Sequence, residues 1–545
     1  MPDLDTDVME AVCDSVDDIH DLLSVSLTCS VMWRMAIRQL LRTHTIHLKS
    51  RKAIRGFRDF ILNQKPTRAH HIHSLVIPRN AWSWTIDDGC RIDDVGQLMD
   101  ILDCAVNLHS LDLSLDAYHV EPGRASSAFA GMVALGHLSL ADPDLRWAHE
   151  ALSALRSPPV TLCLKIELSD ETRASLPVLA THLNQTFSSP SILTSLHLDW
   201  VSFSRNNSFL SLPQFRSVRS VIITQVKHEP RLEPLLHLFP CLEGTLRLRI
   251  TAPKNMIRFA SPARLAGIQE ENKRAQEVSR WARLDRLDCE STTAFLLALQ
   301  CPVRHLTIDR FDTTLLANIQ MQHLVVADIH FPQDLAALKG CTHTLSIAGG
   351  PTHVVLIVRY DAEDYALNNE CPNRPIPRWN ENTVFESAVQ ALASFPHLTH
   401  ARLVFHCSKE YSFKDDLDEY DFVHQMRECA SISPPSPRAL AAACPALRYL
   451  VVTAAGRDET QPDIAPHGRW LRTRAWRVVL VEGEGCRRRA DTDGEEPAPR
   501  MLEELSHYAV GRLIEDEDMG LPEEWEYGLE LASEFHHEDE LRTEC

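Results

Sequence analysis

A short phrase of alternating apolar residues recurs along most of this 545-residue chain and constrains its fold more than any other feature. The phrase is φ-x-x-φ-x-φ, where φ is apolar, and clear copies end at Leu111-Asp112-Leu113, Leu138-Ser139-Leu140 and Leu196-His197-Leu198. Further copies end at 75–77, 162–164, 221–223, 246–248, 306–308, 345–347, 403–405 and 450–452. Period-two alternation is typical of a strand with one buried face. Because one such unit cannot bury its apolar side alone, the units are expected to stack on one another.

The phrase resembles the leucine-rich repeat, in an irregular form that mostly lacks the Asn or Cys normally found after the second φ. The resemblance implies an α/β fold in residues 69–482: a solenoid of parallel strands, with helices on its convex side. An ordinary α/β protein with parallel strands is the alternative. A helix is also expected from Ser261-Pro262 to about Arg283, because Ser is a good N-cap and Pro suits the first helical position.

The stacking predicts which side chains meet a partner. In φ-x-φ the outer residues face the core, whereas the middle residue and the residue after the phrase point to the concave face. The predicted target-binding residues are Asp112, Ser114, Ser139, His197, Asp199, Arg247, Arg249, Thr307, Asp309 and Ser346. This mixed, polar set suits a protein or peptide better than a lipid, although each residue could instead be an ordinary solvated strand residue.

The first 45 residues have a different pattern, with apolar residues at helical spacing. Leu4, Val8 and Val12 recur every four residues and predict a first helix. Asp18 is a suitable N-cap for a second helix, with Asp21 in its first turn. A third helix is predicted around Trp33 to Leu41. Together they form a three-helix unit with more apolar surface than a small core can bury, and this unit either caps the body or docks on a partner.

The second half of this head, Asp21-Leu22-Leu23-Ser24-Val25-Ser26-Leu27-Thr28-Cys29 followed by Trp33-Arg34-Met35-Ala36, resembles the F-box. The usual Leu-Pro of the first F-box helix is absent. Head and body together are similar to the F-box–leucine-rich-repeat proteins of fungi. The resemblance implies binding to the Skp adaptor of a cullin–RING (SCF-type) ubiquitin ligase. The residues that would form the shared core and adaptor face are Leu4, Val8, Val12, Leu22, Leu23, Val25, Leu27 and Trp33.

Composition narrows the kind of partner. The net charge is −20, and the segment from Glu482 onward, with 21 acidic and 6 basic residues, carries most of it. This argues against nucleic acid, which normally needs a basic face. The longest apolar runs, such as Val354–Val358, fall far short of the roughly 20 residues that cross a membrane. We therefore expect neither nucleic acid nor a membrane as a partner.

The 15 cysteines argue for reduced thiols. None lies in a C-x-x-C pair, and the closest two are Cys289 and Cys301, which opposes both a zinc site and a disulfide scaffold. The N-terminal residues are acidic and lack the pattern of a secretory signal. We expect an intracellular protein, in the cytoplasm, the nucleus or both.

Motifs of known catalytic sites are missing from the sequence, including the phosphate loop, the nucleophile elbow and the zinc helix. His70, His71 and His73 have no acidic or thiol ligand nearby in the sequence, and the acidic run 415–421 lacks the Gly and ligand spacing of an EF-hand. We expect no enzyme activity, metal or cofactor.

The expected organisation is therefore an F-box-like domain (1–45), a linker helix (46–68), repeats (69–482), a disordered linker (483–500) and an acidic tail with one amphipathic helix (501–545). A long surface loop is expected at 359–383. The predicted function is substrate recognition for an SCF-type ligase. The alternatives are a repeat scaffold with no ubiquitin role and, from a different class, a hydrolase or transferase with an unmarked site.

Overall fold

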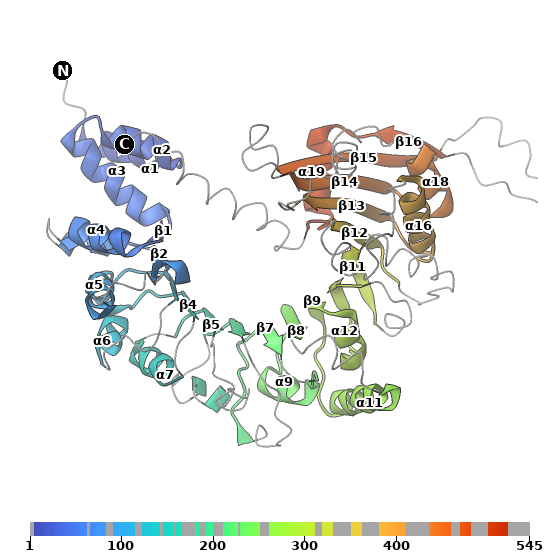
Figure 1. Cartoon of the computed structure of the whole chain (residues 1–545), viewed down its shortest axis with the longest axis horizontal. Helices are drawn as coiled ribbons and strands as arrows, with labels where there is room; N and C mark the ends of the chain where they lie inside the picture. The colour runs from blue at the N-terminus through green and yellow to red at the C-terminus, as the bar shows by residue number, and fades with distance from the viewer. Residues whose placement is uncertain are drawn as a thin grey trace, which may run out of the picture. The chain divides into compact units, whose positions relative to one another are not determined.

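A computed structural model describes residues 5–62, 66–82, 91–114, 123–141, 145–156, 158–165, 180–181, 183–184, 192–199, 211–226, 229–250, 261–310, 319–330, 350–361, 381–409, 435–458, 469–480 and 500–521. The chain divides into two compact units, Met1–Trp281 and Ala282–Cys545. Each unit is described by itself below (Figure 1).

The first unit begins with three helices, α1 (Thr6–Asp14), α2 (Ile19–Ser26) and α3 (Ser30–Thr43). The Asp18 carboxylate accepts hydrogen bonds from the backbone N–H groups of His20 (2.8 Å) and Asp21 (3.0 Å), so Asp18 starts α2 as predicted. Cys13, Leu22 and Ala36, one from each helix, form the small buried core between them. The principal contacts of α1 and α2 are with α3.

Eight strands follow in this unit among the described residues: β1 (Ile46–His47), β2 (Ser74–Ile77), β3 (Ser110–Ser114), β4 (His137–Ala141), β5 (Thr161–Lys165), β6 (Ser195–Asp199), β7 (Ser220–Val226) and β8 (Thr245–Ile250). Each pairs in parallel with the next. The connecting helices are α4 (Arg51–Leu62), η1 (Pro66–His71), η2 (Arg79–Trp82), α5 (Arg91–Cys104), α6 (Arg124–Gly131), α7 (Leu145–Ala154), α9 (Leu232–Leu238) and α11 (Pro262–Val278).

The second unit contains β9 (Leu284–Cys289), β10 (Val303–Ile308), β11 (Met321–His330), β12 (His353–Asp361), β13 (His400–Lys409), β14 (Tyr449–Asp458), β15 (Arg469–Leu480) and β16 (Arg500–Glu504). Its helices are α12 (Ser291–Leu297), α16 (Glu381–Ala393), α18 (Pro435–Ala443) and α19 (His507–Asp516). Strands β9 to β14 are parallel, whereas β15 and β16 are added antiparallel.

The apolar residues that alternate with other residues in the sequence phrase are the residues that are buried in the sheet. In the register of the first unit, Leu111 pairs with Leu138, Leu138 with Leu162 and Leu162 with Leu196, and all four are buried. The predicted mixed α/β fold with mostly parallel strands is therefore confirmed. The sheet face opposite the connecting helices, which is the face predicted to be concave, is called the inner face below.

Several predicted boundaries are wrong. The sheet begins inside the predicted linker, because Ile46 of β1 pairs with Leu75. Residues 500–504 form the edge strand β16 rather than the start of a helix or a separate tail, and the predicted helix begins later, at His507. Strands β9, β11 and β12 were not predicted, and neither was the antiparallel direction of the last two. The proposed strand at 345–347 and the segments 415–421 and 483–499 lie outside the described residues, as does most of 359–383.

A close backbone approach at Gly244 yields a stability prediction. The Gly244 N–H donates to the Arg219 carbonyl (2.8 Å), and a Cβ at Gly244 would lie 2.8 Å from that oxygen and 2.6 Å from Ser220 Oγ. Gly244→Ala is therefore expected to lower the free energy of unfolding by roughly 1–3 kcal/mol, measured by urea denaturation. The control is Gly56→Ala in α4, where a Cβ meets nothing within 4 Å; an equal loss in both variants would contradict the prediction.

Candidate protein-binding surfaces

The three-helix head leaves large apolar side chains in solvent. Val8 and Val12 of α1 are 49% and 44% exposed, and Ile19 and Leu23 of α2 are 39% and 42% exposed. Leu27, just after α2, is 86% exposed. Each helix contributes a pair at i and i+4, which places the two side chains on one helix face. Apolar side chains gathered in this way indicate an interaction surface.

Other predicted adaptor residues have structural roles. Leu22 is fully buried in the head core, so it supports this surface without being part of it. Val25 is partly buried against the same core. Trp33 is half-buried, and the Arg68 guanidinium lies 4.6 Å from the centre of its ring. Leu4 lies outside the described residues.

Helix α3 joins the head to the body. The His73 N–H donates to the Leu41 carbonyl at 3.2 Å, and Arg68 of η1 lies between the rings of Trp33 and Phe60, 4.6 Å from each centroid. The cap interpretation is therefore correct for α3. The exposed apolar pairs are on α1 and α2.

On the inner face of the first unit, four predicted target-binding residues fall on one row across the strands. The sheet register aligns Asp112, Ser139, Cys163, His197, Ile222 and Arg247. Asp199 lies on the next row, where it accepts a hydrogen bond from Thr224. Asp112, His197, Arg247 and Arg249 are half-buried.

Two of the predicted contacts are corrected by the structure. Ser139 is 3% exposed, so it offers little surface to a partner. Asp309 Oδ1 accepts from the backbone N–H (2.7 Å) and hydroxyl (3.0 Å) of Ser291, so its carboxylate holds the start of α12. Thr307 remains half-buried on an inner-face row, and Ser346 lies outside the described residues.

A thiol and an imidazole meet on the first row, and their environment argues against nucleophilic chemistry. Cys163 Sγ lies 3.2 Å from His197 Nδ1. Burial raises the pKa of the Cys163 thiol and lowers the pKa of His197 to about 4. An activated thiol needs a lowered pKa and a basic partner, so both shifts have the wrong direction for catalysis.

The inner face of the second unit carries a ladder of four histidines, one from each of β10 to β13. His305, His323, His353 and His400 are aligned by the register, and successive ring centroids are 4.1, 4.1 and 4.2 Å apart. All four are 6–7% exposed. Burial lowers the pKa of His305 and His400 to about 4 and that of His323 to about 2.

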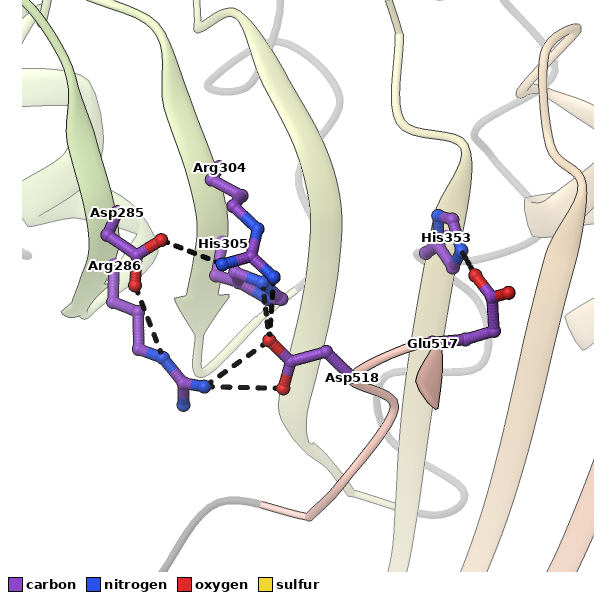
Figure 2. A network of polar contacts seen from close by, with 7 residues as sticks. All are labelled: Asp285, Arg286, Arg304, His305, His353, Glu517 and Asp518. Atoms are coloured by element: carbon purple, nitrogen blue, oxygen red, sulfur yellow. Dashed lines mark hydrogen bonds and ion pairs between the residues drawn. The ribbon is translucent and has the colours of Figure 1, made fainter. Parts of the chain in front are cut away.

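Two carboxylates from the end of α19 face this ladder (Figure 2). Asp518 lies 2.8 Å from His305 Nε2 and 3.2 Å from a guanidinium nitrogen of each of Arg286 and Arg304. Glu517 Oε2 lies 3.0 Å from His353 Nε2 and 3.8 Å from His400 Nε2. Arg286 and Arg304 are half exposed, so each single ion pair contributes little, and the approach of two guanidinium groups and one imidazole to a single carboxylate is what distinguishes this contact.

Beside the ladder the inner face is apolar. Val325, Val355, Ile357, Val404, Val451 and Ala475 form a cluster with Val510 and Met519 of the C-terminal segment. Figure 1 shows α19 on the opposite side of these strands from α16 and α18. Arg402, 4% exposed, donates from Nη1 to the Met519 carbonyl at 2.6 Å and from Nε to Thr453 Oγ1 at 3.2 Å.

His353, His400 and Glu517 bring three possible metal ligands within 4.8 Å of one another. The two imidazoles, however, are stacked with an interplanar angle of 2° and a centroid distance of 4.2 Å. The lone pair of each nitrogen lies in the plane of its ring, so parallel rings direct their lone pairs past any ion placed between them. The arrangement therefore fits carboxylate recognition better than metal binding.

The sequence contained a signal for the ladder that the repeat phrase did not use. A histidine directly precedes the buried residues of four strands, in His305-Leu306, His323-Leu324, His353-Val354 and His400-Ala401. Recurrence at the same strand position implies stacking across a parallel sheet. The carboxylates that face the ladder could not be assigned in the same way, because they come from more than 100 residues further along the chain.

No family model and no curated protein matches this chain. Among 26 matching chains of solved structures is a leucine-rich-repeat protein from Leptospira interrogans. It is 13% identical, the match covers 76% of this chain and 91% of that chain, and the TM-score is 0.27. Within the described residues, no helix has the length and apolar character needed to cross a membrane.

The strand order, the parallel pairing and the buried leucine rows define the class of protein: an α/β repeat protein with a mostly parallel sheet. Such repeats build extended surfaces for binding other proteins.

Proposed function

We propose that this chain is a substrate-recognition adaptor of an SCF-type ubiquitin ligase, in which the head binds the Skp adaptor and the inner faces bind a target protein. The observation that carries the proposal is the set of exposed apolar side chains on α1 and α2, at Val8, Val12, Ile19, Leu23 and Leu27. The resemblance of residues 21–36 to the F-box supports the identity of the partner.

The proposed mechanism is proximity. A target held on the repeats while the head is bound to the ligase would have its lysines at a high effective concentration near the activated ubiquitin. No residue of this chain needs to act in catalysis.

Co-purification of the full-length chain with a Skp adaptor tests the proposal directly. We expect a stable complex at micromolar concentrations of both proteins. Failure to form it, under conditions in which an established F-box protein binds the same adaptor, would overturn the ubiquitin role.

A protein-interaction scaffold without a ubiquitin role is the second candidate. It is favoured by the packing of α3 against η1 and β2, which lets the head act as the cap that the end of a repeat array requires. A chain that binds a target but no Skp adaptor would support this alternative.

A further inference from the structure

Residues 505–521, here called the tail segment, rest on the inner face of strands β9 to β14 in the manner of a bound peptide. Leu505, Val510, Leu513, Ile514, Met519 and Leu521 contact the apolar cluster of that face. This face, formed by the histidine ladder, Arg286, Arg304, Arg402 and the apolar cluster, is called the receiving surface.

The two halves of the contact are complementary in charge. The tail segment contributes the carboxylates of Glu517 and Asp518, and the receiving surface presents Arg286, Arg304 and the Nε2 atoms of His305 and His353. The neighbouring acids Glu515 and Asp516 are exposed, and Asp516 pairs with Arg512 of its own helix at 3.5 Å. Recognition therefore depends on two particular carboxylates of an acidic run.

The backbone at Asp518 has an unusual conformation for a residue with a side chain. Asp518 has φ +48°, in the left-handed region that favours glycine. The Met519 N–H donates to the Ile514 carbonyl at 3.0 Å, which is the hydrogen bond that ends a helix in a Schellman motif. The left-handed residue of that motif, here Asp518, is usually Gly or Asn. An aspartate in this conformation adds a carboxylate that glycine would lack, and that carboxylate meets Arg286, Arg304 and His305.

Helix α19 has few buried side chains of its own. Among its ten residues, α19 fully buries only Val510, and Tyr508 is 78% exposed. By comparison α9, with seven residues, buries five. Elements that open locally are drawn from those with few buried side chains, which is the property that a displaceable occupant needs.

We infer that the receiving surface is a binding site for acidic amphipathic helices that end in two adjacent carboxylates, and that the tail segment is its internal occupant. An external target of the same chemistry displaces the tail segment. This inference rests on the proposed function for the role of the target, and it names the class of target that the repeats would select.

The test uses a fluorescently labelled synthetic peptide of residues 505–521 and the full-length chain. Glu517→Gln with Asp518→Asn weakens the internal occupant, and Asn keeps the preference for a left-handed backbone. The matched control is Glu515→Gln with Asp516→Asn, which changes the same charge on the exposed side. We expect the 517/518 variant to bind the peptide at least tenfold more tightly than the wild type or the control, because a competing internal copy lowers apparent affinity.

Amide hydrogen exchange on the same proteins distinguishes local opening of the tail segment from unfolding of the strands beneath it. The expected result is faster exchange at residues 509–519 in the 517/518 variant only, with β11 to β14 protected as in the wild type. Faster exchange of those strands as well would show the tail segment to be an integral part of the core and would overturn the inference. Equal peptide affinity in all three proteins would also overturn it. The assay contains no Skp adaptor. A negative result would therefore count against this inference and would not affect the test of the ubiquitin role.

Discussion

A chain carrying Leu23→Asp is expected to lose binding to a Skp adaptor by at least a hundredfold. Leu23 is 42% exposed at the exposed face of α2, next to Ile19 one turn earlier, so a partner that covers this face would have to bury the new carboxylate. An unpaired buried charge is expected to lower the affinity by several kcal/mol, which corresponds to this loss. Isothermal titration of the full-length variant with the adaptor measures the effect.

Ser24→Asp is the matched control for this substitution. It introduces the same charge one residue away in the same helix, at an exposed position whose hydroxyl donates only to the His20 carbonyl of its own helix. We expect affinity close to that of the wild type. Thermal unfolding should be similar for both variants, since neither side chain is in the head core. Equal losses of affinity at 23 and 24, or none at 23, would contradict the docking face on α2.

The second unit is expected to lose stability as the pH falls from 6.5 towards 4. The pKa of His305 and His400 is about 4 and that of His323 about 2 in the folded chain, against an ordinary value of 6.5. Burial is the main cause, and the neighbouring ladder histidines lower the pKa of His323 and His400 further. The other charges that modify these pKa values are those of Asp518, Arg286, Arg304, Asp285, Glu517 and Arg448. Between these values the unfolded chain binds protons that the folded chain does not, so stability is full above pH 6.5 and declines below it by about 1.4 kcal/mol per pH unit for each histidine.

His323→Phe should relieve part of this acid sensitivity. The ring lies 4.1 Å from the rings of both His305 and His353, and phenylalanine keeps that stacking without a titrating group. At pH 5 the variant is expected to have lost roughly 2 kcal/mol less than the wild type, relative to pH 7.5, in urea denaturation. The control is His397→Phe, which removes an exposed imidazole. A wild-type stability that does not change between pH 7.5 and 5 would contradict the prediction.

The strands of the first unit could be predicted because their signal is local. In β3 one side contacts the connecting helices and Asp112 on the other side is half-exposed, so Leu111-Asp112-Leu113 records the two faces directly. In β12 the run Val354–Val358 is buried throughout, because the tail segment covers its inner face. A strand buried on both faces loses its alternation, which is why β11 and β12 were missed. In β9 the phrase is present as Leu284-Asp285-Arg286-Leu287-Asp288-Cys289, with Cys289 at its last apolar position, and it was overlooked.

Of the two candidate binding surfaces, the one on the head could be predicted from local spacing and the receiving surface could not. The exposed faces of α1 and α2 follow from helical spacing, and the structure retains Val8, Val12, Leu23 and Leu27 as exposed side chains. Leu22 could not be separated from Leu23 by sequence, since which of two adjacent leucines faces the core depends on where α1 and α3 pack. The receiving surface requires a contact between strands near residue 305 and a turn at residue 518, and no local pattern reports such a distance.

The terminal strands bear on whether copies of this chain polymerise. A sheet edge presents unpaired N–H and C=O groups to which a neighbouring molecule can add a strand. Strand β1 has two residues, and β16 has five, among them Glu503 and Glu504, with Glu504 paired to Arg474 at 2.8 Å. Short and charged edges discourage strand addition, so this repeat array is expected to end at its own boundaries and not to grow into fibres.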